Sequence, residues 1–230
     1  MAVSALVRAF SGLGRRLRGK PRQGVELAAA SVRLGTEYGG YAVVLERLGP
    51  QSVVYSLGLG EDISFDLELI ERCGCEVYGF DPTPRSIAWV KAQNPPARLH
   101  VRELGVAAYD GTASFTPPAN PEHISHRMSA GNGGAGEIRF EVRKLSTLMR
   151  ELGHQRLDLL KMDIEGAEYD VVDDLLASGL QPSQLLLEFH HGMYGIELSR
   201  TEATLDKLRS AGYRIFDAQP TGREFSLLSG

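Results

Sequence analysis

The chain has 230 residues, enough for one sizeable domain, and 43% of them are apolar, which suffices to bury a core. Its formal net charge of −4 excludes the global basic field that attracts nucleic acid, so no nucleic-acid partner is expected. No apolar run approaches the roughly 18 residues of a membrane span, and Cys73 and Cys75 lie too close together for a disulfide framework. These features favour a cytoplasmic protein with reduced thiols.

The N-terminal segment differs in composition from the rest. Residues 1–22 carry six basic side chains and no acid, and apolar residues recur among them at helical spacing. We interpret residues 1–30 as a basic amphipathic arm that packs on its own domain. Weak contact of residues 1–22 with an anionic membrane surface is the alternative. Residues 31–230 are expected to form the main domain, and the sequence gives no indication of its oligomeric state.

Strand-like and helical patterns alternate along the main domain. The strand-like runs are SVVYSL, EVYGF, RLHVREL, LDLLKMD, QLLLEFHH and YRIF. This alternation predicts an α/β fold with a mostly parallel sheet and helices on both faces, with ligands bound beyond the carboxyl ends of the strands. The segments YRIFDA and REFSLLS flank the turn-prone QPTGR, so a closing hairpin is expected to add one antiparallel strand.

A glycine loop follows the first of these runs. Gly58 and Gly60 come directly after VVYSL, and Asp81 ends the next run about twenty residues later. Glycines at this place let the backbone approach a ligand, and an acid at the end of the second strand can accept hydrogen bonds from both hydroxyls of a ribose. The pattern indicates an adenosine-type ligand. Glycines that end the strand for steric reasons alone are the alternative.

The residues after the glycines distinguish between ligands. A dinucleotide site favours a small residue where this chain has Ile63, and the charges of Glu61 and Asp62 oppose a pyrophosphate. No Lys-Ser/Thr pair follows the glycines, which excludes a Walker-type phosphate loop here. The two acids suit S-adenosylmethionine, which carries a sulfonium and an ammonium but no phosphate. Their alternative role is to stabilise the first turn of the helix.

The region after the third run is less regular. Topology alone would place Gly105 and Val106 against an adenine ring, and AAYDGTASF predicts a hairpin on its Asp-Gly turn. Residues 117–136 are rich in Pro, Gly and Asn, which is typical of a lid or a substrate loop, although simple solvent exposure is the alternative. The chemically active side chains of this loop are His123, Ser125, His126 and Arg127.

The fourth run ends in LLKMDIEGAE. At the two-residue period of a strand, Lys161, Asp163 and Glu165 share one side. A lysine beside two acids at the ligand edge of a sheet is a candidate catalytic cluster, because such charges are seldom gathered without a function. The alternative is an ion-paired cluster that closes the sheet and serves the N-terminus of the next helix.

The fifth run, QLLLEFHH, places Glu188 and His190 on one face. A histidine at the end of a strand beside acids is a candidate general base, and Asp163 is our second choice for that role. Asp163, Glu188 and His190 could instead bind a divalent metal through oxygen and nitrogen ligands. The spacing does not indicate a metal, and both readings stay open.

Taken together, six segments resemble the FkbM-type S-adenosylmethionine-dependent methyltransferases. They are GTEYGGYAVV (35–44), VVYSLGLGEDISFD (53–66), VYGFDPTP (77–84), LDLLKMDIEGAEYDVVDDLL (157–176), LLLEFHH (185–191) and TGREFSLL (221–228). The resemblance covers nearly the whole chain after about residue 30. It implies a class I methyltransferase fold, which is Rossmann-like, with a seven-stranded, mostly parallel sheet and one antiparallel strand.

The resemblance also implies an activity, most often methylation of a hydroxyl on a sugar, glycan or natural product. The alternatives are an N-methyltransferase that acts on a protein or small molecule, and a catalytically silent S-adenosylmethionine-binding module. By this likeness, the residues at the cofactor's methionine end are Gly58, Gly60 and Glu61, Asp81 holds its ribose, and the junction with substrate is formed by Asp163 and Glu165. The usual class I pattern has an acid where this chain has Ser56, so Glu61 or Asp62 is expected to compensate.

Overall fold

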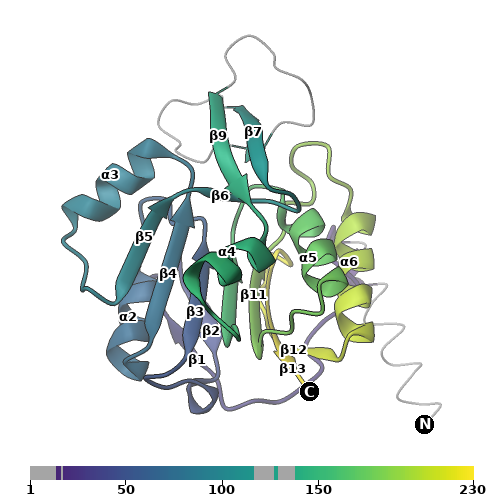
Figure 1. Ribbon diagram of the computed structural model, residues 1–230. Helices are drawn as coiled ribbons and strands as arrows, with labels where there is room; N and C mark the ends of the chain where they lie inside the picture. The colour runs from purple at the N-terminus through teal and green to yellow at the C-terminus, as the bar shows by residue number, and fades with distance from the viewer. Residues whose placement is uncertain (1–13, 17, 117–126, 129–137) are drawn as a thin grey trace.

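The computed structural model describes residues 14–16, 18–116, 127–128 and 138–230 of the chain (Figure 1). Its centre is a seven-stranded sheet with the order β12-β13-β11-β10-β3-β4-β5. The strands are β3 (Val53–Leu57), β4 (Glu76–Asp81), β5 (Leu99–Glu103), β10 (Leu159–Met162), β11 (Gln184–Glu188), β12 (Tyr213–Ala218) and β13 (Glu224–Ser229). In this sheet β13 alone runs in the direction opposite to the other six strands. The predicted sheet, including its closing hairpin, is confirmed.

Helices cover both faces of the sheet, as predicted. One face carries α2 (Ser64–Cys73) and α3 (Pro84–Ala92), and the other carries α4 (Leu145–Leu152), α5 (Glu168–Ala177) and α6 (Leu198–Ser210). Successive residues of β3 point to opposite faces of the sheet: Val54 packs with α2, whereas Tyr55 and Leu57 pack with α4 and α5. The central strand β10 is buried along its whole length, as a parallel strand covered on both faces must be.

A small second sheet stands at one end of the main sheet, at the top of Figure 1. Its order is β6-β9-β7-β8, formed by β6 (Gly105–Val106), β7 (Gly111–Thr116), β8 (Arg127–Met128) and β9 (Ile138–Arg143). The hairpin predicted on the Asp-Gly turn is wrong, because β7 pairs with β9 and β8. The reason lies in Asp110, whose carboxylate accepts hydrogen bonds from Lys144 N and Thr147 Oγ1 at the start of α4. Apart from 127–128, the predicted lid at 117–136 lies outside the described residues.

A hairpin near the start of the domain reaches the glycine loop. It is formed by β1 (Val32–Leu34) and β2 (Tyr41–Val43), and the 3-10 turn η1 (Leu45–Arg47) follows it. In the turn of the hairpin, Thr36 Oγ1 donates a 2.5 Å hydrogen bond to Asp62 Oδ2. The β1–β2 hairpin therefore helps to fix the segment that follows the two glycines of the loop.

The described part of the N-terminal arm lies against α6. Arg16 pairs with the buried carboxylate of Glu202, and Arg22 pairs with Asp206. Residues 1–13 lie outside the described part of the chain. Among the helices that the structure describes, none combines the length and the apolar character needed to cross a membrane.

Candidate active site

The glycine loop is pressed against the end of β10. Gly58 has φ +78°, and a Cβ added to it would lie 1.7 Å from the carbonyl oxygen of Asp163. Only glycine fits at this position, for reasons of both conformation and space. Gly60 also has a positive φ of +54°, but a Cβ there would meet nothing within 4 Å. The predicted glycine loop thus packs directly against the segment that carries the predicted catalytic acids.

Asp81 holds the glycine loop in shape. Its side chain is buried, its Oδ2 accepts hydrogen bonds from the backbone N–H groups of Leu59 (3.0 Å) and Gly60 (3.1 Å), and its Oδ1 accepts one from Thr83 N (2.8 Å). A carboxylate offers about four acceptor positions. Three of them are engaged here, so a bidentate grip on both ribose hydroxyls requires some of these bonds to be exchanged. The ribose role of Asp81 stays a prediction.

The acids after the glycines have partners within the protein. Glu61 forms an ion pair with Arg85 at 2.9 Å. Asp62 Oδ1 accepts a hydrogen bond from Ser64 N at the start of α2. Burial alone would raise the pKa of Asp62, but its hydrogen bonds from Ser64 and Thr36 outweigh that effect and lower the pKa. Both acids therefore support the local structure, and their selection of a cationic ligand stays a prediction.

Beneath the loop lies a buried polar group that the sequence indicated only in part. Lys161 is buried in β10, and its Nζ donates a 2.7 Å hydrogen bond to the carbonyl oxygen of Gly58. Asp66 and Ser56 are also buried, and Asp66 Oδ1 and Ser56 Oγ have no hydrogen-bond partner among the described residues. Burial raises the pKa of Asp66 although the charge of Lys161 opposes the shift. Lys161 thus supports the glycine loop through its backbone.

Two predicted cofactor residues are packed inside the protein. In β6, Val106 belongs to the core that also contains Tyr55 and Leu57. A Cβ added to Gly105 would lie 2.9 Å from Cγ1 of Val142. The contact of Gly105 and Val106 with an adenine ring stays a prediction.

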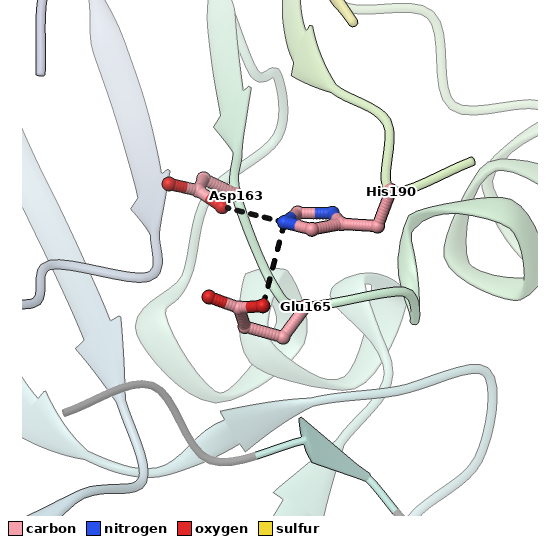
Figure 2. Close-up of side chains that lie close together, drawn as sticks. All are labelled: Asp163, Glu165 and His190. Atoms are coloured by element: carbon pink, nitrogen blue, oxygen red, sulfur yellow. Dashed lines mark ion pairs between the residues drawn. The ribbon is translucent and has the colours of Figure 1, made fainter. Parts of the chain in front are cut away.

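Three side chains meet at the carboxyl edge of the central strands (Figure 2). His190 Nε2 lies 3.6 Å from Asp163 Oδ1 and 3.4 Å from Glu165 Oε2. Asp163 follows β10 directly, Glu165 lies in the turn after it, and His190 comes two residues after the end of β11. We call Asp163, Glu165 and His190 the edge cluster. The structure thus brings together three of the four predicted catalytic residues, while Lys161 lies beneath the glycine loop.

Glu168 orients the edge cluster, and the sequence had indicated it only as a helix-capping acid. Its carboxylate is fully buried, accepts backbone hydrogen bonds from Ile164 N and Gly166 N, and lies 3.0 Å from His190 Nδ1. Between these residues, Glu165 has a positive φ of +54°, which non-glycine residues rarely adopt. Glu168 therefore fixes both the turn that presents Glu165 and the orientation of the His190 ring.

The charges of the site shift one another's titration. Burial raises the pKa of Asp163 to about 6, despite the nearby charges of Lys161 and His190. Burial and the charge of Asp163 raise the pKa of Glu188 to about 7. Burial alone would lower the pKa of His190, but the hydrogen bond and charge of Glu168 outweigh it and raise the pKa to about 9. His190 therefore holds its proton at neutral pH, so its role as a free general base, which stays a prediction, requires that this proton first be lost.

An exposed tyrosine, which no motif in the sequence indicated, completes the site. The Tyr194 hydroxyl donates a 2.5 Å hydrogen bond to Glu165 Oε2, and its ring stacks at 22° on the ring of His190 with the centroids 6.1 Å apart. Its side chain is 41% exposed. Tyr194 therefore forms a wall of the site on its solvent side.

Known proteins match the part of the chain that holds these features. Residues 55–215 match the methyltransferase FkbM domain. A probable methyltransferase-like protein 24 of Rattus norvegicus is 30% identical over 180 residues, which cover 72% of this chain and 42% of that protein. The 2-O-methyltransferase NoeI of Sinorhizobium fredii is 27% identical over 140 residues, which cover 54% of this chain and 57% of that protein. The chain thus matches about half of the length of these two relatives.

Among solved structures, the matches have low sequence identity and TM-scores below 0.5. Fibrillarin of Aeropyrum pernix, with natively bound S-adenosyl-L-methionine, is 12% identical with a TM-score of 0.43, over 88% of this chain and 83% of that one. The family match is the stronger finding, because it runs from β3 to β12 and contains the glycine loop and the edge cluster. The chain belongs to the FkbM methyltransferase family.

Proposed function

We propose that this protein transfers a methyl group from S-adenosylmethionine to a hydroxyl oxygen of a small molecule or glycan. The observation that carries the proposal is the contact between Gly58 and the backbone of Asp163, where a Cβ would overlap the carbonyl oxygen at 1.7 Å. Because of this contact, a ligand on the glycine loop and a ligand at the edge cluster would share one edge of the sheet. Membership of a methyltransferase family and the 2-O-methyltransferase activity named for NoeI support the same reading.

The cofactor assignment rests on the loop and what surrounds it. Ile63 is buried in the core beside α2, at the place where a dinucleotide site favours a small residue. The space beside Gly60 is open, so a ligand could approach the backbone there. Glu61 and Asp62 place negative charge next to this space, which suits a sulfonium and an ammonium better than a pyrophosphate.

The chemistry divides between cofactor and protein. When bound, S-adenosylmethionine would supply an activated methyl group, which the acceptor oxygen would take as the carbon–sulfur bond breaks and its electron pair stays on sulfur. The protein's part is alignment, which can contribute ~7 to 11 kcal/mol. The edge cluster receives the hydroxyl proton, a contribution of ~10² to 10⁴ in rate. Our candidate for this step is Asp163, which adjoins both Gly58 and His190.

An amine acceptor is the second candidate, and one observation favours it. The side chains of Asp163, Glu165, Glu168 and Glu188 outnumber the two cationic groups beside them, Lys161 and His190. Such an excess of negative charge attracts a cationic substrate. Oxygen remains our first choice because a relative is named for 2-O-methylation.

The test is to identify the atom that gains the methyl group. The protein is incubated with S-adenosylmethionine that carries a labelled methyl, together with panels of saccharides, hydroxylated natural products and matched amines, and the products are analysed by mass spectrometry and NMR. We expect the label on oxygen, with Asp163→Asn slower by ~10² to 10⁴. The matched control is Asp173→Asn, the same change at a residue of α5 that forms a half-exposed ion pair with Lys207 of α6. Label on nitrogen would overturn the proposal in favour of the amine reading, and no transfer to any acceptor would favour a silent binding module.

A further inference from the structure

The edge cluster has the geometry of a metal site. One ligand atom from each of Asp163, Glu165 and His190 can be chosen so that all three lie within 4.8 Å of one another. Bonds of ~2.0 to 2.2 Å to a shared ion would hold such atoms about 3 to 4.4 Å apart, so small side-chain movements close the site. Glu188, which the sequence placed in the alternative metal set, is not part of this group within the described residues.

The imidazole supplies an independent observation that points to a ligand. The side chain of His190 is only 5% exposed, and its Nε2 points into the gap between the two carboxylates (Figure 2). The distances from Nε2 to these carboxylates, 3.4 and 3.6 Å, exceed the ~2.7 to 2.9 Å of a charge-assisted hydrogen bond. A buried ring nitrogen therefore faces two carboxylate oxygens without a close partner.

The other side of the ring has the support that metal-binding histidines usually have. His190 Nδ1 lies 3.0 Å from the buried carboxylate of Glu168. Metal binding would displace the proton from Nε2 to solvent, and a carboxylate beside Nδ1 favours keeping the remaining proton there, which leaves the lone pair of Nε2 for the metal. A second oxygen ligand is also held in place, because Glu165 accepts the hydrogen bond of Tyr194 and its backbone adopts the left-handed region. Strained backbone of this kind is concentrated at functional sites.

From this arrangement we infer that Asp163, Glu165 and His190 bind a divalent metal ion with mixed oxygen and nitrogen ligands, for which Mn²⁺ is a suitable probe. The three protein ligands would leave other coordination positions of the ion free for an acceptor. Binding of the ion does not depend on the proposed function, whereas a catalytic role for the ion rests on the proposed methyl transfer. There the ion would bind the acceptor hydroxyl and ease its deprotonation, as metals do for bound water.

Binding is measured without cofactor or acceptor, so its failure is separate from a failure of the proposed function. Chelator-treated protein is titrated with Mn²⁺, free Mn²⁺ is followed by electron paramagnetic resonance, and pulsed measurements detect coupling to a histidine nitrogen. We expect one site with nitrogen coupling. Glu165→Gln should weaken Mn²⁺ binding at least tenfold, and His190→Asn should abolish the nitrogen coupling. Glu168→Gln should weaken binding ~10- to 100-fold while the coupling remains.

The matched control is Glu188→Gln, the same substitution at a neighbouring strand end, which removes no ligand atom of the edge cluster. The titrations are run at pH 8, above the Glu188 pKa of about 7, so that both substitutions remove a negative charge. We expect Glu188→Gln to bind Mn²⁺ within a few-fold of the unsubstituted chain. Equal losses in Glu188→Gln and Glu165→Gln would overturn the ligand set, because charge attraction alone would then explain binding. Absence of nitrogen coupling in the unsubstituted chain, or binding no tighter than in Glu165→Gln, would overturn the site.

Discussion

Replacement of Gly58 by alanine tests the close contact between the glycine loop and the backbone of Asp163 in the edge cluster. The left-handed backbone at φ +78° penalises an L-residue by ~1 to 2 kcal/mol, and forcing a methyl group into a packed site adds ~1 to 3 kcal/mol. The expected loss in free energy of unfolding is therefore ~2 to 5 kcal/mol, a large part of the ~5 to 15 kcal/mol of an average domain. The new methyl would meet the carbonyl oxygen of Asp163 at 1.7 Å, so the end of β10 must move.

Gly60→Ala is the matched control, because Gly60 also has a positive φ but a Cβ there would meet nothing within 4 Å. Only the conformational penalty of ~1 to 2 kcal/mol applies to it. Urea denaturation of both variants and the unsubstituted chain, with the m-values compared, measures the difference. Equal destabilisation of the two variants would show that the contact between Gly58 and Asp163 adds nothing to the cost of the substitution.

Three further predictions concern buried charges. Lys161→Met removes the hydrogen-bond donor to the Gly58 carbonyl, so calorimetry should show weaker binding of S-adenosylhomocysteine. Urea denaturation should show a loss of ~1.5 to 3 kcal/mol in the free energy of unfolding. Unchanged affinity would show that Lys161 does not support the glycine loop for binding. Because burial raises the pKa of Asp66 in the folded chain, its carboxyl favours folding below the unfolded pKa, and this contribution is lost as pH rises through the folded pKa. The stability of Asp66→Asn relative to the unsubstituted chain should therefore increase from acid to neutral pH, whereas a pH-independent difference would contradict the burial argument. Glu202→Gln removes the carboxylate that Arg16 and the backbone of Arg22 contact, so trypsin should cleave the arm faster; an unchanged cleavage rate would show that this contact does not hold the arm.

Hydrophobic periodicity was enough to predict the main sheet. The strand-like runs are short and either apolar throughout or alternately apolar and polar. Because helical patterns separate them, few arrangements of the strands in one sheet are possible. The small sheet could not be predicted in the same way. Asp110 belongs to a turn-prone Asp-Gly pair, yet its carboxylate accepts hydrogen bonds from the start of α4, more than thirty residues later. The local sequence gives no indication of that contact.

The candidate site was predicted by residue type more successfully than by arrangement. Strand alternation placed Glu188 beside His190, but β11 ends at Glu188, so the alternation no longer applies to the histidine. Glu165 instead reaches His190 because its own backbone turns into the left-handed region. Glu168 and Asp66 were hard to identify because a buried acid has the same sequence signature as an exposed one, and their cationic neighbours lie on other elements.

Calorimetry tests whether the chain binds the cofactor. The 230-residue chain is titrated with S-adenosylhomocysteine and separately with NAD, beside Asp81→Ala and, as the control, Asp206→Ala on the exposed side of α6. The proposed cofactor binding requires that S-adenosylhomocysteine binds while NAD does not, and that Asp81→Ala alone loses the binding, because Asp81 holds the glycine loop. Preference for NAD, or no binding of either ligand by the folded chain, would contradict it.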